Sequence, residues 1–517
     1  MALKSQEQLL RRQAQQAVRF LCHQRWPSLK SREEAPQTLE QQPGALRFPS
    51  DIYVKAVGPK ETTYTLHVRN KGEHSEAQLA GLVSILKRGS SGVFLLRGFA
   101  LALALITEFA LTRSLGKSGY GILAIGLAWL AILQTIGTLG IHTALVRFIP
   151  SLLAETPQKS PKGLIAWAGK RMSISGALVG GAFATGVVIS PVSPPLKTVL
   201  LAVAVMVPIQ AANLHCQGAL QGLKKPVKAL FPTQAGVFVG VIVGIVALNG
   251  AGISLTPPMV ALVWALSLGI GLAIAAAWKR KAMPIGIAKA PSRGRAKRVA
   301  LAGLGLCWSS LAALLIHQAD PAMLGFLAGP DEAALYSIAN RAGLLILFGL
   351  AAVNAAIAPL ISQLYSEDKK DDLQRILGIA ARGILLYSIP ATAFITLAAP
   401  WYLPFFGPGF EDAQVPLTYI ALAQCLNALT GSVGFLLNMT GNHWAAVKAL
   451  TVAAILKIAL NFWLMPIWGA EGAAMGSAAM LIVWNLWMYI EVKRRLGLEP
   501  SALAALPRYH GKLSGFK

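Results

Sequence analysis

The feature that most constrains this chain is a series of apolar stretches, each long enough to cross a membrane. They follow one another between residues 92 and 489 and are separated by short polar or basic segments. An α-helix needs about 20 apolar residues to span a hydrocarbon core ~30 Å thick. The stretches at 200–211, 236–248 and 260–277 lie in windows of that length with few or no charges. We therefore predict an all-α membrane protein of about 12 transmembrane helices, because backbone groups in lipid must be satisfied within their own helix.

The composition agrees with this prediction and argues against a soluble enzyme. Hydrophobic residues make up 55% of the chain and charged residues only 13%, whereas soluble proteins carry about 25% charged residues. The net charge of +25 would favour nucleic-acid binding if the basic residues formed one patch. They are instead spread over alternate loops, so we expect no nucleic-acid partner.

The distribution of Lys and Arg predicts the topology. Of the 47 basic residues, only Arg113, Lys117 and Lys197 fall in one set of loops, and nearly all others fall in the opposite set or at the termini. Basic residues stay on the cytoplasmic side of a membrane because they resist translocation. We therefore predict a multi-pass inner-membrane (plasma-membrane) protein with both termini in the cytoplasm. No apolar segment typical of a signal peptide occurs in the first thirty residues.

The same pattern suggests five segments along the chain. The basic, Pro- and Gly-containing stretch at 279–298 divides the apolar part and is predicted to be a loop without helical periodicity. The segments are a cytoplasmic extension (1–91), a first six-helix lobe (92–278), the basic linker (279–298), a second six-helix lobe (299–490) and a cytoplasmic tail (491–517).

The N-terminal extension has little material for a large core. Two alternating stretches, 51–57 and 62–69, flank a Gly-Pro-containing turn and predict a β-hairpin. The Gln-rich stretch 6–16 could form an amphipathic helix. The four cysteines show no metal-binding spacing, so we expect neither a metal site nor a cofactor.

The two halves of the apolar region resemble each other. Gln210 and Asn213 in the fourth predicted span recur as Gln424 and Asn427 in the tenth, 214 residues later. Two more echoes occur in the same order: Gly222 with Lys228-Ala229-Leu230 recurs as Gly441 with Lys448-Ala449-Leu450, and Tyr120 as Tyr336. Six spans per half is an even number, so both halves enter from the same side. We predict two parallel six-helix repeats around a central cavity.

A few charged residues fall inside predicted spans, where charges are costly and usually face a cavity or a partner. We regard three cations as candidate substrate-binding residues and two acids as candidate ion-coupling residues. Arg97 and Glu108 are eleven residues apart on one helix face, about 16 Å along its axis. The alternative is that these charges pair with one another, or reach the interface, for assembly alone. The five are Arg97, Arg341, Lys457, Glu108 and Asp320.

Amide side chains form stripes on two of the predicted helices. Amides donate and accept hydrogen bonds, which suits sugar hydroxyls, so we assign these residues to a candidate substrate site. The alternative is hydrogen bonding between helices, worth about 0.6 kcal/mol per pair. A third pattern, Gly236, Gly240 and Gly244, predicts close helix packing and no ligand. The candidate amides are Gln210, Asn213 and Gln217 in the fourth span and Gln424 and Asn427 in the tenth.

Several short motifs resemble a known family. The tract Ser114-Leu115-Gly116-Lys117-Ser118-Gly119-Tyr120-Gly121 leads into Leu139-Gly140-Ile141 and Arg147-Phe148-Ile149-Pro150. The second half adds Asp320-Pro321-Ala322-Met323-Leu324-Gly325, Ala358-Pro359-Leu360-Ile361 and Trp468-Gly469-Ala470-Glu471-Gly472. Together they resemble polysaccharide-biosynthesis flippases of the O-antigen type, in the multidrug/oligosaccharidyl-lipid/polysaccharide exporter superfamily. The similarity covers roughly residues 92–495 and leaves out the N-terminal extension.

The resemblance implies a flippase that moves a polyprenyl-diphosphate-linked oligosaccharide outward by alternating access. It implies membrane lipids as partners, with a polymerase and glycosyltransferases as candidates. Three span cations against two acids favour an anionic headgroup. Three alternatives remain open at this stage: a cation-coupled multidrug exporter of the same superfamily, a membrane-embedded polysaccharide polymerase or glycosyltransferase, and a passive scramblase or scaffold. The sequence contains no P-loop, HExxH or similar catalytic motif, so no catalytic residue is assigned.

Overall fold

The computed structural model describes residues 46–47, 52–57, 63–68, 72–155, 161–283 and 293–502. The chain divides into two compact units, Met1–Lys87 and Arg88–Lys517.

The first unit contains a small antiparallel sheet in the order β1-β2-β3, formed by Leu46–Arg47, Ile52–Val57 and Thr63–Val68. Ile52 pairs with Val68 and Val57 with Thr63. This confirms the hairpin predicted from the alternating pattern, and β1 adds a short third strand. The Gln-rich stretch 6–16 lies outside the described residues.

The second unit is all-α in its described part. Its first lobe comprises α2 from residue 92 onward through α7, and proline fills the first position of three of these helices. Proline suits that position because its missing N–H would have no partner there. The bounds are α2 Gly72–Thr138, α3 Ile141–Glu155, α4 Lys162–Ile189, α5 Pro194–Gly222, α6 Pro226–Gly250 and α7 Pro257–Ala282.

The second lobe comprises α8 to α14. It includes two short 3₁₀ helices, η1 and η2, in the loop before α12. The bounds are α8 Arg293–Leu327, α9 Pro330–Ser366, α10 Lys370–Leu397, α11 Ala399–Tyr402, η1 Leu403–Phe406, η2 Glu411–Ala413, α12 Gln414–Thr430, α13 Val433–Met439 and α14 His443–Leu496.

Twelve spans can be counted in the part of the chain that the structure describes. Nine helices are long and apolar enough to cross a membrane, or ten if the pair α12 and α13, bent by 45°, is one span. Two of the nine have 44 and 53 apolar-rich residues, about twice the length required. Each is broken at a glycine with positive φ, Gly116 in α2 and Gly469 in α14. Counting each broken helix as two spans gives the predicted twelve.

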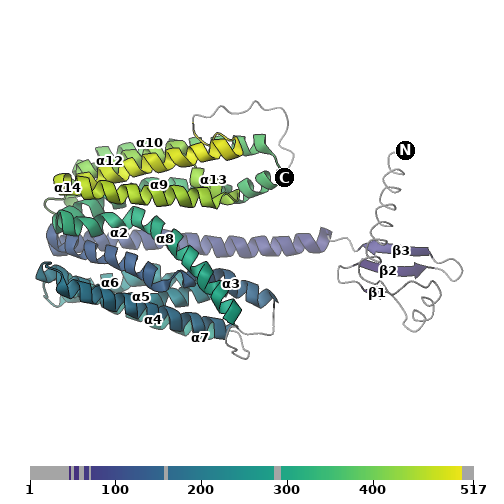
Figure 1. Ribbon diagram of the computed structural model, residues 1–517, viewed down its shortest axis with the longest axis horizontal. Helices are drawn as coiled ribbons and strands as arrows, with labels where there is room; N and C mark the ends of the chain where they lie inside the picture. The colour runs from purple at the N-terminus through teal and green to yellow at the C-terminus, as the bar shows by residue number, and fades with distance from the viewer. Residues whose placement is uncertain are drawn as a thin grey trace. The chain divides into compact units, whose positions relative to one another are not determined.

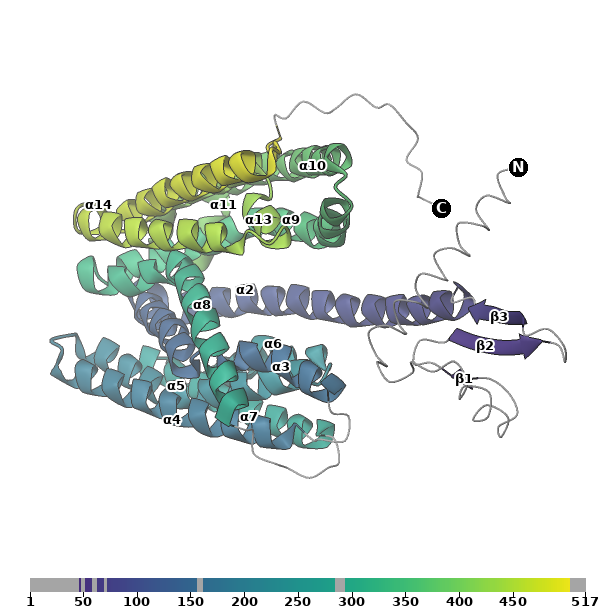
Figure 2. The ribbon, with the colours of Figure 1, turned by 45° about the vertical axis from the view of Figure 1, so that its right-hand side comes forward.

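The helices form two layers with a third group between them. In Figure 1, α9, α10, α12 and α14 lie in one layer and α4 to α7 in the other, while α2 and α8 run between the two. The long helix α14 folds back on itself, which is the hairpin made at Gly469. Turned by 45°, Figure 2 shows α8 crossing obliquely from one layer to the other. The two-repeat helical fold expected from the sequence is therefore observed.

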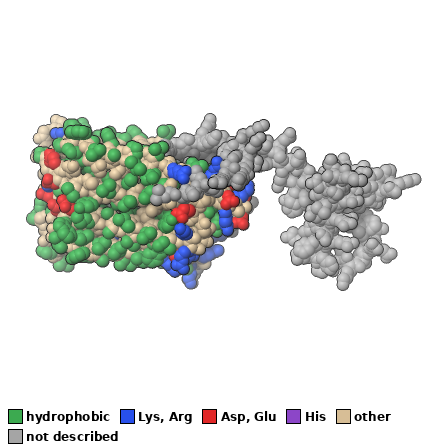
Figure 3. Space-filling model, turned by 90° about the horizontal axis from the view of Figure 1, so that it is seen from above, with side chains coloured by type: hydrophobic (Ala, Val, Ile, Leu, Met, Phe, Trp, Pro, Cys, Tyr) green, Lys and Arg blue, Asp and Glu red, His purple; other side chains and the backbone are tan. Residues whose placement is uncertain are grey.

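The face seen in Figure 3 carries a broad hydrophobic belt, and the Lys and Arg side chains visible on it gather mostly at one end. We call this the basic end; α7 and α14 finish there with Lys279–Lys281 and Lys493–Arg495. The opposite end, called the short-loop end, has the connections 190–193, 251–256 and 398–413.

The basic linker is shorter than the sequence suggested. The predicted loop 279–298 begins inside α7 and ends inside α8, and residues 284–292 lie outside the described part. The predicted tail at 491 is likewise still helical up to Leu496. For α7 and α14 the reason is physical: cationic side chains at a helix C-terminus interact favourably with its dipole, so the helix continues past the apolar core.

Close packing explains the glycine stripe in α6. A Cβ added to Gly240 would lie 2.6 Å from Ser267 Oγ, and one added to Gly244 would lie 2.4 Å from Val263 Cγ1. Both neighbours are on α7, so these glycines let α6 and α7 approach closely, as predicted.

Candidate functional site

A cavity of about 260 Å³ lies between the two lobes. Helices α2, α5, α6 and α7 of the first lobe line it, together with α8 and α9 of the second. It is therefore the central cavity that the sequence predicted. The polar and aromatic residues that line it are Thr107, Glu108, Tyr120, Gln134, Gln210, Thr233, Phe238, Trp264, Gln318, Ser337, Asn340 and Arg341.

An ion pair joins the two lobes across this cavity. The Nε of Arg341 on α9 donates to Oε1 of Glu108 on α2. The Glu108 side chain is 10% exposed, whereas that of Arg341 is 40% exposed. The guanidinium therefore has donors left over for a second anion. Because the partners belong to different lobes, any separation of the lobes at this level must break the pair.

Two buried amide oxygens in the cavity wall have no hydrogen-bond partner among the described residues: Oε1 of Gln134 and Oε1 of Gln210. An unpaired buried acceptor costs about 1–3 kcal/mol, and buried polar groups are almost always paired. Hydroxyl groups of a ligand would satisfy both oxygens.

The structure divides the amide stripe of the fourth span. Gln210 lines the cavity. Asn213 is 1% exposed and donates to the Leu268 carbonyl at 3.0 Å. Gln217 accepts from Thr233 at 2.8 Å. The last two therefore connect α5 to its neighbours α7 and α6, and only Gln210 has the geometry of a ligand-binding residue.

The counterparts in the tenth span lie away from the main cavity. Asn427 donates to Gln424 Oε1 at 3.2 Å. Gln424 is 5% exposed and borders a separate cavity of about 20 Å³ within the second lobe. That volume is close to the minimum for one water molecule. The structure thus brings neither residue to the central cavity.

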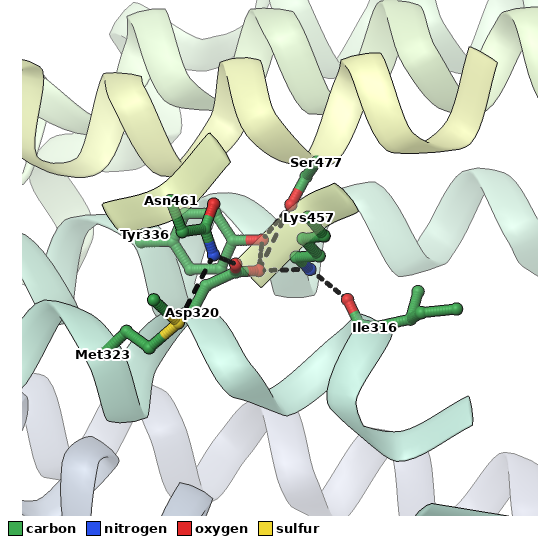
Figure 4. A network of polar contacts seen from close by, with 7 residues as sticks. All are labelled: Ile316, Asp320, Met323, Tyr336, Lys457, Asn461 and Ser477. Atoms are coloured by element: carbon green, nitrogen blue, oxygen red, sulfur yellow. Dashed lines mark hydrogen bonds and ion pairs between the residues drawn. The ribbon is translucent and has the colours of Figure 1, made fainter. Parts of the chain in front are cut away.

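A second polar cluster is buried inside the second lobe (Figure 4). Asp320 on α8 is 0% exposed, and Lys457 on α14 is 1% exposed; Lys457 Nζ lies 2.6 Å from Asp320 Oδ2. Tyr336 donates to the same oxygen, and Ser477 does so at 3.2 Å. Asn461 donates to Oδ1 at 2.7 Å. Every side chain in this cluster belongs to the second lobe.

This cluster changes how two of the candidate charges are interpreted. Lys457 was assigned to substrate binding and Asp320 to ion coupling, but in this conformation they neutralise each other out of reach of the cavity. They are 137 positions apart in the sequence, which is why their spacing gave no sign of the pair. Arg97 is exposed and does not line the central cavity. Only Glu108, Arg341 and Gln210 among the candidates meet in one place.

The cavity is closed toward the short-loop end by contacts between the lobes. Arg113 donates to the Phe405 carbonyl at 2.7 Å, and Lys117 pairs with Asp412 at 3.2 Å. The ring of Phe109 packs edge-on against Phe406 with centroids 6.2 Å apart. Two of the three basic residues predicted for this set of loops therefore hold the lobes together.

Weakening this closure should favour a conformation open at the short-loop end. The Lys117–Asp412 pair is exposed, with 66% of the Asp412 side chain accessible, and such pairs contribute about 0.2–1 kcal/mol. We expect Asp412→Asn to raise the open population by up to about fivefold. The measurement is the rate at which an impermeant thiol reagent, added from that side, labels a cysteine at Gln134. Glu411→Gln, which removes the adjacent carboxylate that forms no ion pair with Lys117, should leave the rate unchanged, and equal rates in both variants would contradict the assignment.

Some residues of both clusters escaped the sequence analysis. Gln134, Asn340, Asn461 and Ser477 are ordinary span residues by composition, and nothing in their spacing identifies them, while Tyr336 was noted only as the counterpart of Tyr120. One signal was available. Each lobe has an acid in its first helix and a tyrosine in its second, Glu108 with Tyr120 and Asp320 with Tyr336, at nearly the repeat offset already established for the amides.

Comparisons with known proteins agree on the family. The polysaccharide biosynthesis protein family matches residues 86–365, and the MatE family matches residues 301–463. A probable low-salt glycan biosynthesis flippase, Agl15 of Haloferax volcanii, is 23% identical over 176 residues. That alignment covers 34% of this chain and 37% of the relative, so it spans little more than a third of either protein.

Solved structures share the fold. A multidrug resistance MATE family transporter of the MOP superfamily, in an inward-facing conformation, superposes with a TM-score of 0.61 at 14% identity, covering 76% of this chain and 95% of that one. The lipid II flippase MurJ, in an inward closed conformation, gives 0.59 at 15% identity, covering 78% and 87%. At such identities the likeness concerns the fold.

Proposed function

This chain belongs to the polysaccharide biosynthesis protein family and is a multi-pass membrane transporter of the MOP superfamily, and from that premise we propose that it flips a polyprenyl-diphosphate-linked oligosaccharide across the membrane. The cargo would pass from the cytoplasmic to the outer leaflet by alternating access, as part of cell-surface polysaccharide synthesis.

One observation carries the proposal: the central cavity combines a partly free guanidinium with unpaired amide oxygens. Arg341 has donors beyond the one given to Glu108 and can bind a diphosphate oxygen through charge-assisted hydrogen bonds. Gln134 and Gln210 can accept from sugar hydroxyls. The groups needed for an anionic, hydroxyl-rich headgroup therefore line one space, while the polyprenyl tail can remain in lipid.

The size of the cavity limits what it encloses at one time. Its volume, about 260 Å³, lies just below the ~300–1,000 Å³ of typical small-molecule sites. It would hold the diphosphate and the first sugar in this conformation, with the remainder of the oligosaccharide extending toward the basic end. Lysines and arginines gathered there would attract the anionic lipid headgroup.

We assign the basic end to the cytoplasm of the inner (plasma) membrane and the short-loop end to the outside, following the positive-inside rule. Outward movement of a negative charge across an inside-negative membrane gains about 2.3 kcal/mol per 100 mV. A diphosphate could therefore be driven by the membrane potential alone. Reporter fusions should place the C-terminus in the cytoplasm and residue 405 outside; a cytoplasmic signal at 405 would contradict this topology.

The multidrug exporter is the second candidate, favoured by the MatE match and by aromatic residues in the cavity, where Trp264 packs against Phe238 with centroids 6.0 Å apart. An exporter of cationic drugs would need a free acid. Glu108, the one acid lining the cavity among the described residues, is already paired with Arg341. The charge balance therefore supports the anionic cargo.

The proposed function can be tested in vesicles. The purified full chain is reconstituted with a radiolabelled lipid-linked oligosaccharide, and the fraction exposed to an impermeant glycosidase is followed with time. Transport should exceed that of protein-free vesicles and should be absent with a cationic dye as cargo. Movement of the dye without movement of the glycolipid would favour the multidrug exporter instead.

The assignment of Gln210 to the cavity and of Asn213 to a helix contact predicts different accessibility for these two residues, which are three positions apart. In a cysteine-free background, Gln210→Cys should react with a small polar thiol reagent, and the glycolipid should slow the reaction. Asn213→Cys should stay unreactive, because Asn213 is buried against Leu268. Mass spectrometry measures the two labelling rates. Equal reactivity at both positions would remove the basis for a sugar site at Gln210.

A further inference from the structure

The buried Asp320–Lys457 pair has a feature that the cavity pair lacks: all its members lie in one lobe. Asp320 and the Ile316 carbonyl are on α8, Tyr336 is on α9, and Lys457 is on α14. Alternating access requires the lobes to move relative to each other, which must disturb Glu108–Arg341. It does not require any contact of Lys457 to change.

Two oxygens contact the Lys457 ammonium directly, and two hydroxyls bond to one of them. Its Nζ lies against Asp320 Oδ2 and donates to the Ile316 carbonyl oxygen, one helical turn earlier on α8. The hydroxyls of Tyr336 and Ser477, 2.9 Å apart, both bond to that same Asp320 oxygen. A carboxylate, a carbonyl and two hydroxyls are hard oxygen ligands, which suit small cations without transition-metal chemistry. In Figure 4 the two hydroxyls lie at the carboxylate, and the ammonium lies between the carboxylate and the Ile316 carbonyl.

Burial makes a positive charge at this point obligatory. A carboxylate with no exposed surface pays a large desolvation cost unless it is paired or protonated. The four groups that bond to Asp320 all donate to it, Lys457 through its ammonium and Tyr336, Ser477 and Asn461 through neutral donors, and this is the surrounding of an ionised carboxylate. In this structure the compensating cation is supplied by the chain itself.

We infer that the Lys457 ammonium is a resident cation, held in an oxygen-lined site at Asp320 that would otherwise take up a small monovalent cation such as Na⁺. The second lobe consequently needs no exchangeable ion, and its acid does not couple transport to an ion gradient. Glu108 in the cavity, whose partner comes from the other lobe, is the acid left free to change its state during the cycle. This inference rests on the proposed transport cycle but not on the identity of the cargo.

The test measures thermal unfolding of the purified full chain in detergent, at constant ionic strength in NaCl, KCl or choline chloride. The wild type should unfold at the same temperature in all three salts. Lys457→Met should unfold several degrees lower in choline, and Na⁺ should restore part of that loss in a saturable manner. Asp320→Asn combined with Lys457→Met, which removes the acid as well, should show no response to Na⁺.

Three results would overturn the inference. One is a saturable Na⁺ response in the wild type that Asp320→Asn abolishes, because an exchangeable cation would then bind beside Lys457. Another is a folded Lys457→Met variant that responds to pH but not to Na⁺, which would mean that the empty site takes up a proton. If Lys457→Met does not fold in any salt, the wild type decides: transport that depends on a Na⁺ gradient and needs Asp320 would refute the resident cation. The unfolding readouts do not depend on whether the cargo is a glycolipid.

Discussion

Replacing Lys457 with methionine is expected to lower the free energy of unfolding by about 3–5 kcal/mol, the cost of removing one partner from a buried ion pair. The reason is that Asp320, with 0% of its surface exposed, would keep its charge without compensation. Asp320→Asn should be similarly costly, since it would leave the buried ammonium unpaired. Removing both charges in one variant should cost much less than the two single changes added together.

A double-mutant cycle measures this expectation directly. The four proteins are unfolded by heat or denaturant in choline buffer, so that no small cation can replace the ammonium. Coupling between the two sites should reach several kcal/mol, above the 0.5–3 kcal/mol usual for residues in contact. Lys448→Met is the matched control: it removes a lysine from the same helix, α14, at an exposed position and should change stability by no more than about 0.5 kcal/mol. Additive effects of the two single variants would show that the pair contributes little in the folded protein.

Neutralising Arg341 to glutamine should lower glycolipid transport by about 10- to 100-fold, which corresponds to losing one charge-assisted hydrogen bond of about 1.5–3 kcal/mol. Protein abundance in the membrane should remain near normal, because the Arg341 side chain is 40% exposed and Glu108, left without its partner, borders the cavity rather than a packed core. The vesicle assay measures the rate, and immunoblotting of the membrane fraction measures the abundance.

A second variant separates a binding role from a structural one. If Arg341 only neutralises Glu108, then Glu108→Gln added to Arg341→Gln should restore transport, because no unpaired charge remains. If Arg341 binds the diphosphate, the double variant should stay as defective as the single one. Lys228→Gln, at an exposed position in the first turn of α6, controls for the loss of a positive charge and should transport at the normal rate. Recovery in the double variant would therefore count against the anion site.

The sequence was sufficient for the membrane architecture because that architecture depends on one-dimensional quantities. The length of each apolar stretch gives a span, the side of the basic residues predicts an orientation, and repeated amides 214 residues apart reveal two similar halves. Bilayer thickness and backbone hydrogen bonding impose these rules on every helix separately. Even the hairpin before the first span followed from strand alternation and a Gly-Pro turn.

The partners of the charged and amide side chains were decided only by the tertiary structure. Glu108 and Arg341 are 233 positions apart and Asp320 and Lys457 are 137 apart, so no local period connects them. A helix face that is polar in sequence can border a cavity at Gln210 and a packed neighbour at Asn213 within a single turn. The stripe gives the direction of a side chain from its helix, but what lies in that direction depends on how the other helices pack. For this reason the sequence identified the charged and amide side chains that are energetically unfavourable inside a membrane span. The fold determined which of these side chains remain available to a ligand.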